Sequence, residues 1–368
     1  MNRFLSQKFR FYSFICMALL LFVHGYNLQE PYLAPFSLVK ERMTFTTFIE
    51  YLFSNGLLRF RIPLLFIISG YIFALQDHKP YGERIKKRAR TLIAPYFIWS
   101  AFGILVTILF EQFAVTSQAV QQAHLDQLGN PTPYSQMHWS QLLDRWAIHP
   151  IAFQLWFIRS LFVYNLLYPV FRWIVTKYPA VWFAIAFLLW LTIFNILFFE
   201  GQGLFFFTLG IWLQKKNFRI DRKPKWFSYY LSWLFFVGLC IIKTFMAFEF
   251  EEYSLTTVHI ISILHVVSVI AGVIAVWYSC DPIVKWCMNK NWFLWIAAFS
   301  FVIYGLHIPL LAYVTRLFYM YINDWPNYRL ITYIFAPVLV LAVCIGFGAL
   351  LRATLPKVYR LATGGRGF

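Results

Sequence analysis

Ionisable side chains within apolar stretches are the most informative residues of this sequence, because burying them in hydrocarbon is costly. Two are histidines, His24 and His307, and three are arginines, Arg59, Arg61 and Arg159. A neutral imidazole can take a proton from an attacking hydroxyl, and a guanidinium group can stabilise an oxyanion or hold a phosphate. Together these residue types favour acyl transfer. The sequence has no GxSxG, HExxH or Walker motif, which argues against serine-hydrolase, zincin and P-loop chemistry.

Three of these groups fall at one depth. His24 lies about 20 Å along its predicted helix at about 1.5 Å per residue, and His307 and Arg159 occupy comparable positions in theirs. We therefore expect all three in the outer half of the membrane. The alternative interpretation is that the histidines are hydrogen-bonded packing residues and that the arginines snorkel to the headgroups. We interpret Lys243, near a predicted helix end, as snorkelling, and His265 as packing.

The arginine pair precedes a proline. Arg59 and Arg61 would point to nearly opposite sides of a regular helix, but Pro63 lacks an N–H and biases Ile62 toward an extended conformation. An extended stretch puts both arginines on one face. We predict a break before Pro63, with both guanidinium groups directed at an internal cavity.

The amino-acid composition indicates that membrane-spanning helices position these histidines and arginines. The chain has 368 residues, 60% hydrophobic, 21% aromatic and 13% charged, and its mean hydropathy is +0.62. A soluble enzyme of this length needs a more charged surface, so we predict an all-α, polytopic membrane protein. Ten segments are long and apolar enough, or nearly so, to cross a bilayer: 11–29, 52–75, 92–112, 151–171, 179–199, 202–214, 227–248, 258–279, 292–318 and 329–351. The sixth is short, and we expect a half-length helix packed inside the bundle.

The positions of the basic residues predict the orientation. With the first residues inside, most of the 32 Lys and Arg side chains fall in cytoplasmic segments, so both chain ends are predicted to be cytoplasmic. This asymmetry accounts for the formal net charge of +17 and disfavours nucleic acid as a partner. The five cysteines show no metal-ligand spacing, and we expect no metal.

No linker or repeat divides the chain, so we treat residues 1–368 as a single membrane domain. The longest predicted outer loop, about 113–150, is a candidate cap.

A basic cytoplasmic loop precedes the third helix. One interpretation is a positive-inside anchor, and another is capture of the phosphates of a cytosolic donor such as coenzyme A. The candidate donor-binding residues are Arg84, Lys86, Lys87, Arg88 and Arg90.

Several motifs, in order along the chain, resemble those of the acyltransferase family 3 of integral-membrane O-acyltransferases, which act on bacterial cell-surface and secreted glycans. They are the histidine of Ala18–His24, the segment Arg61-Ile-Pro63-Leu-Leu-Phe66-Ile-Ile-Ser69-Gly70-Tyr71, the segment Lys87–Tyr96, the helix start Leu155-Trp156-Phe157, and Ser300-Phe-Val-Ile-Tyr304-Gly-Leu-His307-Ile-Pro309. The resemblance implies about ten helices around a cavity, acyl-CoA as donor and a sugar hydroxyl as acceptor. It also implies that His24 is the catalytic histidine and that Arg59 and Arg61 form the adjacent arginine motif.

Our first hypothesis is a bacterial inner-membrane enzyme that transfers an acetyl or other short acyl group from cytosolic acyl-CoA, with acetyl-CoA the first candidate, to an exported or lipid-linked glycan. His24 is the general base or transient acyl carrier, Arg59 and Arg61 hold the donor or stabilise the oxyanion, and Trp156, Arg159, Tyr304 and His307 line the acceptor side. The competing hypotheses are a transporter or flippase of a lipid-linked saccharide and a non-catalytic assembly subunit. The oligomeric state stays open.

Overall fold

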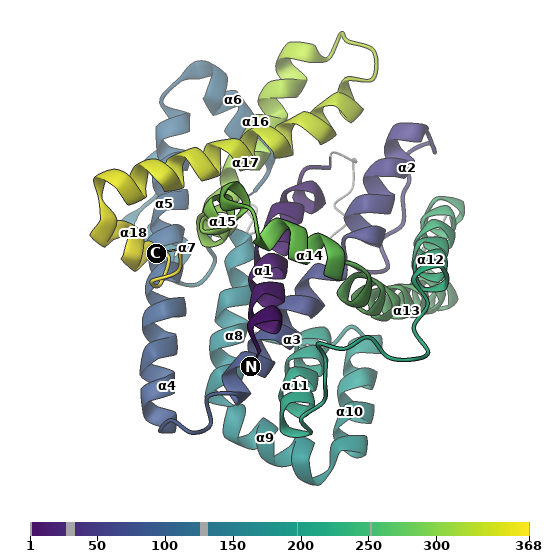
Figure 1. Cartoon of the computed structure of the whole chain (residues 1–368). Helices are drawn as coiled ribbons and strands as arrows, with labels where there is room; N and C mark the ends of the chain where they lie inside the picture. Colours follow the sequence, from purple (N-terminus) through teal and green to yellow (C-terminus); the bar gives the residue numbers. More distant parts are fainter. Residues whose placement is uncertain (1, 27–33, 126–131, 197, 251, 368) are drawn as a thin grey trace. The chain divides into compact units, whose positions relative to one another are not determined.

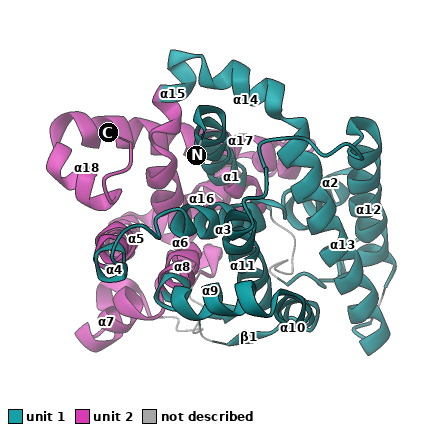
Figure 2. Ribbon diagram, turned by 60° about the horizontal axis from the view of Figure 1, so that its bottom comes forward, with its two compact units in different colours: residues 1–19, 26–85, 163–294 teal, residues 20–25, 86–162, 295–368 magenta. Residues whose placement is uncertain are grey.

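The computed structural model describes residues 2–26, 34–125, 132–196, 198–250 and 252–367, and these are mostly helical (Figure 1). They form two compact units (Figure 2). Unit 1 is Met1–Leu19, Tyr26–Ile85 and Val163–Leu294, and unit 2 is Leu20–Gly25, Lys86–Phe162 and Trp295–Phe368. Residues 126–131 of the predicted cap lie outside the described residues.

Unit 1 holds most of the first helix and the middle of the chain. Its helices are α1 (Arg3–His24, up to Leu19), α2 (Phe45–Tyr51), the π-helical turn η1 (Leu52–Leu57), α3 (Arg61–Ala74), α4 (Tyr81–Arg88, up to Ile85), α9 (Tyr168–Lys177), α10 (Pro179–Leu191), α11 (Gly201–Lys215), α12 (Tyr229–Glu249), α13 (Leu255–Ser279), α14 (Asp281–Met288) and the start of α15 (Asn291–Ala297). The two-residue strands β1 (Asn195–Ile196) and β2 (Phe199–Glu200) pair antiparallel, with Asn195 opposite Glu200.

Unit 2 holds the end of α1 and the remaining elements. They are the π-helical turn η2 (Ala89–Ile93), α5 (Ala94–Glu111), α6 (Ala114–Ala123), the 3₁₀ turn η3 (Tyr134–Gln136), α7 (Trp139–Ala147), the 3₁₀ turn η4 (Phe153–Leu155), most of α8 (Trp156–Leu166), α16 (Ser300–Ile322), α17 (Tyr328–Thr354) and α18 (Pro356–Ala362).

Seven helical segments of the described chain are long and apolar enough to cross a membrane, and they match seven of the ten predicted spans. They are Arg3–His24, Phe45–Ala74, Tyr81–Glu111, Tyr229–Glu249, Leu255–Ser279, Ser300–Ile322 and Tyr328–Thr354. The other three predicted spans contain shorter helices. The run 151–171 is divided between α8 and α9, and α9 and α10 meet at a bend of 119°.

Helix α11 confirms the expected short helix packed against protein. Its 15 residues extend about 22 Å, less than the roughly 30 Å of hydrocarbon, and it packs along α3 within unit 1. The two helices meet at glycines: a Cβ on Gly70 would lie 2.1 Å from the Phe207 carbonyl oxygen, and one on Gly210 would lie 2.2 Å from that of Ile67. No larger residue fits this backbone contact, so the sequence requires glycine there.

In unit 2, the segment between α6 and α8 returns along α5. The Tyr134 N–H donates to Glu111 at the end of α5, at 2.8 Å. The Trp146 indole then donates to the Phe97 carbonyl at 2.8 Å, near the beginning of α5. Helix α7 of the predicted cap therefore packs beside the first turns of α5 and not at its end.

Candidate active site

Two histidine rings stack in unit 2. His24 is the last residue of α1, and His307 lies in α16. Their ring centroids are 5.7 Å apart with 24° between the planes, and the Phe153 ring meets His24 edge-on at 5.0 Å. The structure thus brings together the two histidines that the sequence singles out from opposite ends of the chain.

The end of α1 is held by α17. The Phe22 ring contacts Tyr333 at 6.3 Å between centroids, and a Cβ on Gly25 would lie 2.9 Å from the Pro337 ring. Glycine after His24 therefore lets the end of α1 approach α17 closely. This packing sets the position of the His24 ring.

The backbone of α16 sets the tautomer of His307. The His307 Nδ1 lies 3.0 Å from the carbonyl oxygens of both Ile303 and Tyr304, one turn earlier in the same helix. Because a carbonyl only accepts, Nδ1 carries the proton, and Nε2 is the basic nitrogen of the neutral ring. The residue is fully buried.

Helix α16 breaks directly after His307. Ile308 has φ −111° and ψ 130°, and the Ile308–Pro309 peptide bond is cis. The Gln154 amide donates to the carbonyl oxygens at the break, at 3.2 Å to Tyr304 and 3.4 Å to Ile308. Gln154 is buried, and its Oε1 accepts no hydrogen bond from any described residue. Sequence reasoning missed this glutamine, whose neighbour Phe153 is the ring beside His24.

In unit 1, the predicted break near the arginine pair is present but lies earlier than expected. The π-helical turn η1 ends at Leu57, and α3 begins at Arg61. Ile62 is helical, so the predicted extended conformation at this residue is wrong. Pro63 lies in the first turn of α3, where its missing N–H has no helical partner to lose.

The two arginines take different positions at this break. Arg61 is 2% exposed, and its Nε donates to the Leu58 carbonyl at 2.6 Å, which satisfies a carbonyl that the helix break leaves open. Arg59 is half-buried and lies close enough to Lys243 and His265 to interact electrostatically with both.

Lys243 is the main site residue that sequence reasoning misassigned. It does not snorkel: it is fully buried, and its ammonium group donates to the Asn55 carbonyl at 2.7 Å and to Asn55 Oδ1 at 3.2 Å. The third partner is His265 Nδ1 at 3.1 Å, so His265 is a hydrogen-bonded member of the cluster as well as a packing residue. The sequence signal that could have identified Lys243 is its position as an ionisable residue inside a predicted membrane span.

The break in the helix explains why Asn55 needs this lysine. The Arg59 N–H, which an α-helix would direct to the Asn55 carbonyl, donates instead to Gly56 at 3.1 Å. The Asn55 carbonyl is therefore available to Lys243, whose Nζ donates to it inside an apolar region. We call Asn55, Arg59, Lys243 and His265 the basic cluster.

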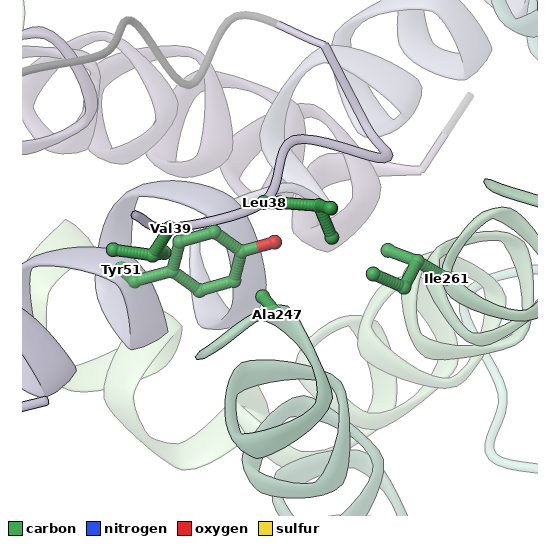
Figure 3. Close-up of a cluster of buried hydrophobic side chains, with 5 residues drawn as sticks. All are labelled: Leu38, Val39, Tyr51, Ala247 and Ile261. Carbon is green, nitrogen blue, oxygen red and sulfur yellow. The ribbon is translucent and has the colours of Figure 1, made fainter. Parts of the chain in front are cut away.

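An apolar group lies next to the basic cluster. Leu38, Val39, Tyr51, Ala247 and Ile261 are all buried and pack together (Figure 3). The Tyr51 ring centroid is 5.8 Å from Lys243 Nζ, and its hydroxyl donates to the Ser37 carbonyl at 2.8 Å. This packing limits water near the lysine and strengthens its hydrogen bonds.

The remaining acceptor-side candidates lie in unit 2. The Tyr304 hydroxyl donates to the Gln154 carbonyl at 2.5 Å, and its ring centroid is 6.5 Å from that of His307. Arg159 donates to the Ile148 carbonyl at 2.5 Å, at the end of α7. Trp156 begins α8 and contacts the neighbouring Phe157 ring. Their roles in binding substrate stay predictions.

The basic loop divides into one internal arginine and four more accessible residues. Arg84 is 5% exposed and donates to Asp77 at 2.9 Å and to the Phe73 carbonyl at 2.7 Å. These contacts give Arg84 a structural position within unit 1. In unit 2, the side chains that can still meet a soluble ligand are the exposed Lys86, Lys87 and Arg90 and the half-buried Arg88.

Asp77, shortly after the end of α3, forms ion pairs with several basic side chains. It pairs with Arg84, with Arg172 at 3.3 Å and with Lys215, and it accepts from the Tyr168 hydroxyl at 2.6 Å. Burial raises the pKa of Asp77, but the hydrogen bonds from Lys215 and Tyr168 and the charges of Lys215 and Arg172 outweigh it and lower the pKa below its ordinary value.

Within the described ranges, no three His, Cys, Asp or Glu side chains gather as a metal site would require.

These features define the class: a multi-pass helical membrane protein with a stacked histidine pair. The model of the family described as "Acyltransferase domain" matches residues 14–351, so the chain belongs to this family and is an acyltransferase. It is 25% identical over 374 residues to "Succinoglycan biosynthesis protein ExoH" of Rhizobium meliloti (strain 1021), covering 100% of this chain and 94% of that protein. No solved structure matches the chain. The resemblance drawn from the sequence motifs is confirmed.

Proposed function

We propose that this acyltransferase moves an acetyl or other short acyl group from cytosolic acyl-CoA to a hydroxyl of an exported or lipid-linked glycan. The observation that carries the proposal is the stacked pair of His24 and His307 in unit 2. The curated relative is named for the biosynthesis of succinoglycan, which supports a glycan as the acceptor. The basic loop of the sequence and the family membership support acyl-CoA as the donor.

In the proposed reaction, the His24 imidazole takes the proton of the acceptor hydroxyl. The acceptor oxygen attacks the thioester carbonyl carbon while His24 takes the hydroxyl proton, and the tetrahedral intermediate then expels the thiolate, which recovers a proton from the imidazolium. The His307 ring stacks against His24 and is proposed to hold the orientation of the ring that receives the proton. The alternative step, in which His24 carries the acyl group, uses the same residue.

The other proposed roles follow from charge. Arg59 and Arg61 are proposed to stabilise the oxyanion or hold the donor, because a guanidinium group stays charged in an apolar region. Lys86, Lys87, Arg88 and Arg90 are proposed to attract the donor phosphates. Tyr304, Trp156 and Arg159 remain the proposed acceptor-side residues.

The proposed location is the bacterial inner membrane, with both chain ends in the cytoplasm. The distribution of Lys and Arg supports this orientation. It puts the basic loop on the side where acyl-CoA is available, and the glycan would be modified before or during export.

The test compares ester-linked acyl groups on envelope and secreted glycans by mass spectrometry. Cells lacking the protein are complemented with wild type, His24→Ala or His259→Ala at equal abundance. His259 lies exposed on α13 and provides the matched control. We expect one ester to return with wild type and with the control, and to fall by about 10²–10⁴-fold with His24→Ala.

Two results would contradict the proposal. Full ester formation with His24→Ala would remove the catalytic role of this histidine. Accumulation of an unmodified lipid-linked saccharide inside the cell, with no change in any ester, would instead support a transporter or flippase.

A further inference from the structure

One buried amide group meets the break in α16. Gln154, in η4, is 2% exposed. Its Nε2 lies 3.2 Å from the Tyr304 carbonyl oxygen and 3.4 Å from those of both Gly305 and Ile308. Because carbonyl oxygens only accept, the amide must present its nitrogen to them, and this fixes its orientation. The side chain therefore hydrogen-bonds the backbone of a segment about 150 residues later in the chain.

The break turns two carbonyl groups of α16 away from their usual helical partners. In α-helical register the Gly305 carbonyl would accept from residue 309, which is a proline without an N–H. At Ile308 the ψ of 130° directs the carbonyl away from the helix axis. A buried carbonyl without a donor costs free energy, and the Gln154 amide supplies a donor at both positions.

The Tyr304 carbonyl connects Gln154 to His307. Its oxygen accepts from Gln154 Nε2 at 3.2 Å and from His307 Nδ1 at 3.0 Å. A carbonyl oxygen has two lone pairs, so it can accept from both donors at once. The position of this carbonyl therefore affects the position of the His307 ring, and the Gln154 amide holds the carbonyl.

The Tyr304 side chain completes the contact in the other direction. Its hydroxyl donates to the Gln154 carbonyl at 2.5 Å, while the Gln154 amide donates to the Tyr304 carbonyl. These reciprocal hydrogen bonds join η4 to α16. The same two elements carry the rings that contact His24: Phe153 of η4 meets it edge-on at 5.0 Å, and His307 of α16 stacks against it at 5.7 Å.

Helix α5 packs closely around this contact. A Cβ on Gly305 would lie 2.3 Å from the Trp99 indole, which donates to the Ala362 carbonyl at 2.8 Å. A Cβ on Gly103 would lie 3.1 Å from the side chain of Ile151, shortly before η4. Close-packed interiors transmit strain, so a shift of one carbonyl at the break is passed to the neighbouring groups.

We propose that Gln154 is a positioning residue of the acyl transfer, and that it acts through His307 by holding the backbone carbonyls at the α16 break. The inference rests on the proposed function, because Gln154 has this role only if the pair of His24 and His307 carries out the transfer. The hydrogen bonds of the amide nitrogen go to the backbone. Removing the amide should therefore lower turnover without weakening donor binding.

The experiment uses two variants that each lose a buried hydrogen bond to α16. Gln154→Met keeps the length of the side chain and removes the amide. The matched control is Thr107→Val, because Thr107 is also fully buried and its hydroxyl hydrogen-bonds the Tyr313 hydroxyl at 2.7 Å, beyond the break in α16. Thermal unfolding of the full chain in nanodiscs should show decreases of similar size for both variants.

Turnover separates the two variants. It is measured as thiol released from acetyl-CoA, with lipid-linked saccharide extracted from cells lacking the protein as the acceptor. We expect Gln154→Met to lower kcat by about tenfold or more and to leave the KM for acetyl-CoA within about twofold, because a displaced ring loses transition-state stabilisation only. Thr107→Val should keep both constants within about twofold of wild type.

A double-mutant cycle tests the route through His307. If Gln154 acts by positioning this ring, Gln154→Met should cost little further turnover once His307→Phe has removed the imidazole. Two independent effects would instead multiply. In the parallel cycle, the effects of Thr107→Val and His307→Phe should multiply.

Modification by diethyl pyrocarbonate gives a measurement that needs no turnover. His307 is fully buried, and His259 is exposed and serves as the internal reference. Peptide mass spectrometry should show His307 modified faster in Gln154→Met than in wild type or Thr107→Val, with His259 equal in all three. Tyr304→Phe removes only the hydroxyl bond to the Gln154 carbonyl, and this milder variant should show the same change if Gln154→Met does not fold.

Each contrary result has its own meaning. If Gln154→Met turns over like Thr107→Val and His307 stays protected, the positioning role is wrong and the proposed function stands. The role is also wrong if Gln154→Met raises the KM and keeps kcat, or if its cycle with His307→Phe is multiplicative. If wild type itself transfers no acyl group, the proposed function fails first, and the protection of His307 still decides whether Gln154 holds this ring.

Discussion

Replacing Lys243 with methionine tests whether the basic cluster maintains the broken helix that carries Arg59 and Arg61. Methionine matches the length of the lysine stem and removes all three hydrogen bonds. The acceptors left behind are the Asn55 carbonyl, Asn55 Oδ1 and His265 Nδ1, which now lie 2.7, 3.2 and 3.1 Å from Nζ.

The expected loss of stability follows from these three acceptors. Each buried acceptor without a donor costs about 1–3 kcal/mol. The variant also no longer buries a polar amino group, which offsets part of that loss. We expect a net decrease of about 2–4 kcal/mol in the free energy of unfolding.

The expected loss of activity follows from the register of η1. If the Asn55 carbonyl loses Lys243, the π-helical turn at Leu52–Leu57 can return to α-helical register, which rotates the following residues by about 100°. Arg59 would then point away from its present direction. We expect turnover to fall by about 10²-fold, the size of effect that a small misplacement of a reacting group produces.

The assay combines thermal unfolding of the purified protein with ester formation on the glycan. Lys225→Met is the matched control, because Lys225 is exposed in the segment before α12. His265→Phe removes one of the three acceptors and leaves both bonds to Asn55, so it should lose less stability than Lys243→Met. If Lys243→Met unfolds at the same temperature as Lys225→Met and keeps full turnover, the proposed support of the helix break is refuted.

Three further predictions concern other parts of unit 1 and the basic loop. Asp77→Asn should lower the unfolding temperature at pH 7. Because the folded pKa of Asp77 is depressed, its contribution in wild type is present above about pH 4 and is lost as the pH falls through the folded pKa, so the two proteins should converge in acid. Gly70→Ala should lower the free energy of unfolding by about 1–3 kcal/mol, because the added Cβ meets the backbone of α11. The control Gly238→Ala adds a Cβ in open space on α12 and should be neutral or slightly stabilising. Thermal unfolding measures both variants. Arg84→Gln should lower the unfolding temperature, because Arg84 is bonded inside unit 1. Lys87→Gln should leave the unfolding temperature unchanged and weaken CoA binding. If Arg84→Gln weakens CoA binding without lowering the unfolding temperature, Arg84 contacts the acyl-CoA donor instead.

The sequence was sufficient where the signal was local to one helix. Apolar length predicted seven helical segments long enough to cross a membrane, and the imidazoles within such runs singled out His24 and His307, whose rings the structure places side by side. The short α11 followed from its length and its flanking glycines. Each of these properties depends on composition along one segment, which is why the structure agrees with them.

The sequence was insufficient where a partner came from another segment. Pro63 indicated a break, but its position was set by Arg61, whose side chain binds the Leu58 carbonyl and begins α3 two residues earlier. The burial of Lys243 depends on the carbonyl of Asn55, which is open only because η1 is π-helical. The placement of Arg84 depends likewise on Asp77, so its residue type alone could not separate it from the neighbouring basic side chains.

The contact between α3 and α11 has a consequence for how the chain is made. A helix of 15 residues is too short to cross the hydrocarbon core by itself, whereas α3 is the second half of the longer segment Phe45–Ala74. During synthesis α11 therefore depends on α3, which is made more than a hundred residues earlier, to bury its glycine face. A chain that ends before Gly201 would leave the glycine face of α3 uncovered, although its earlier helices are already present.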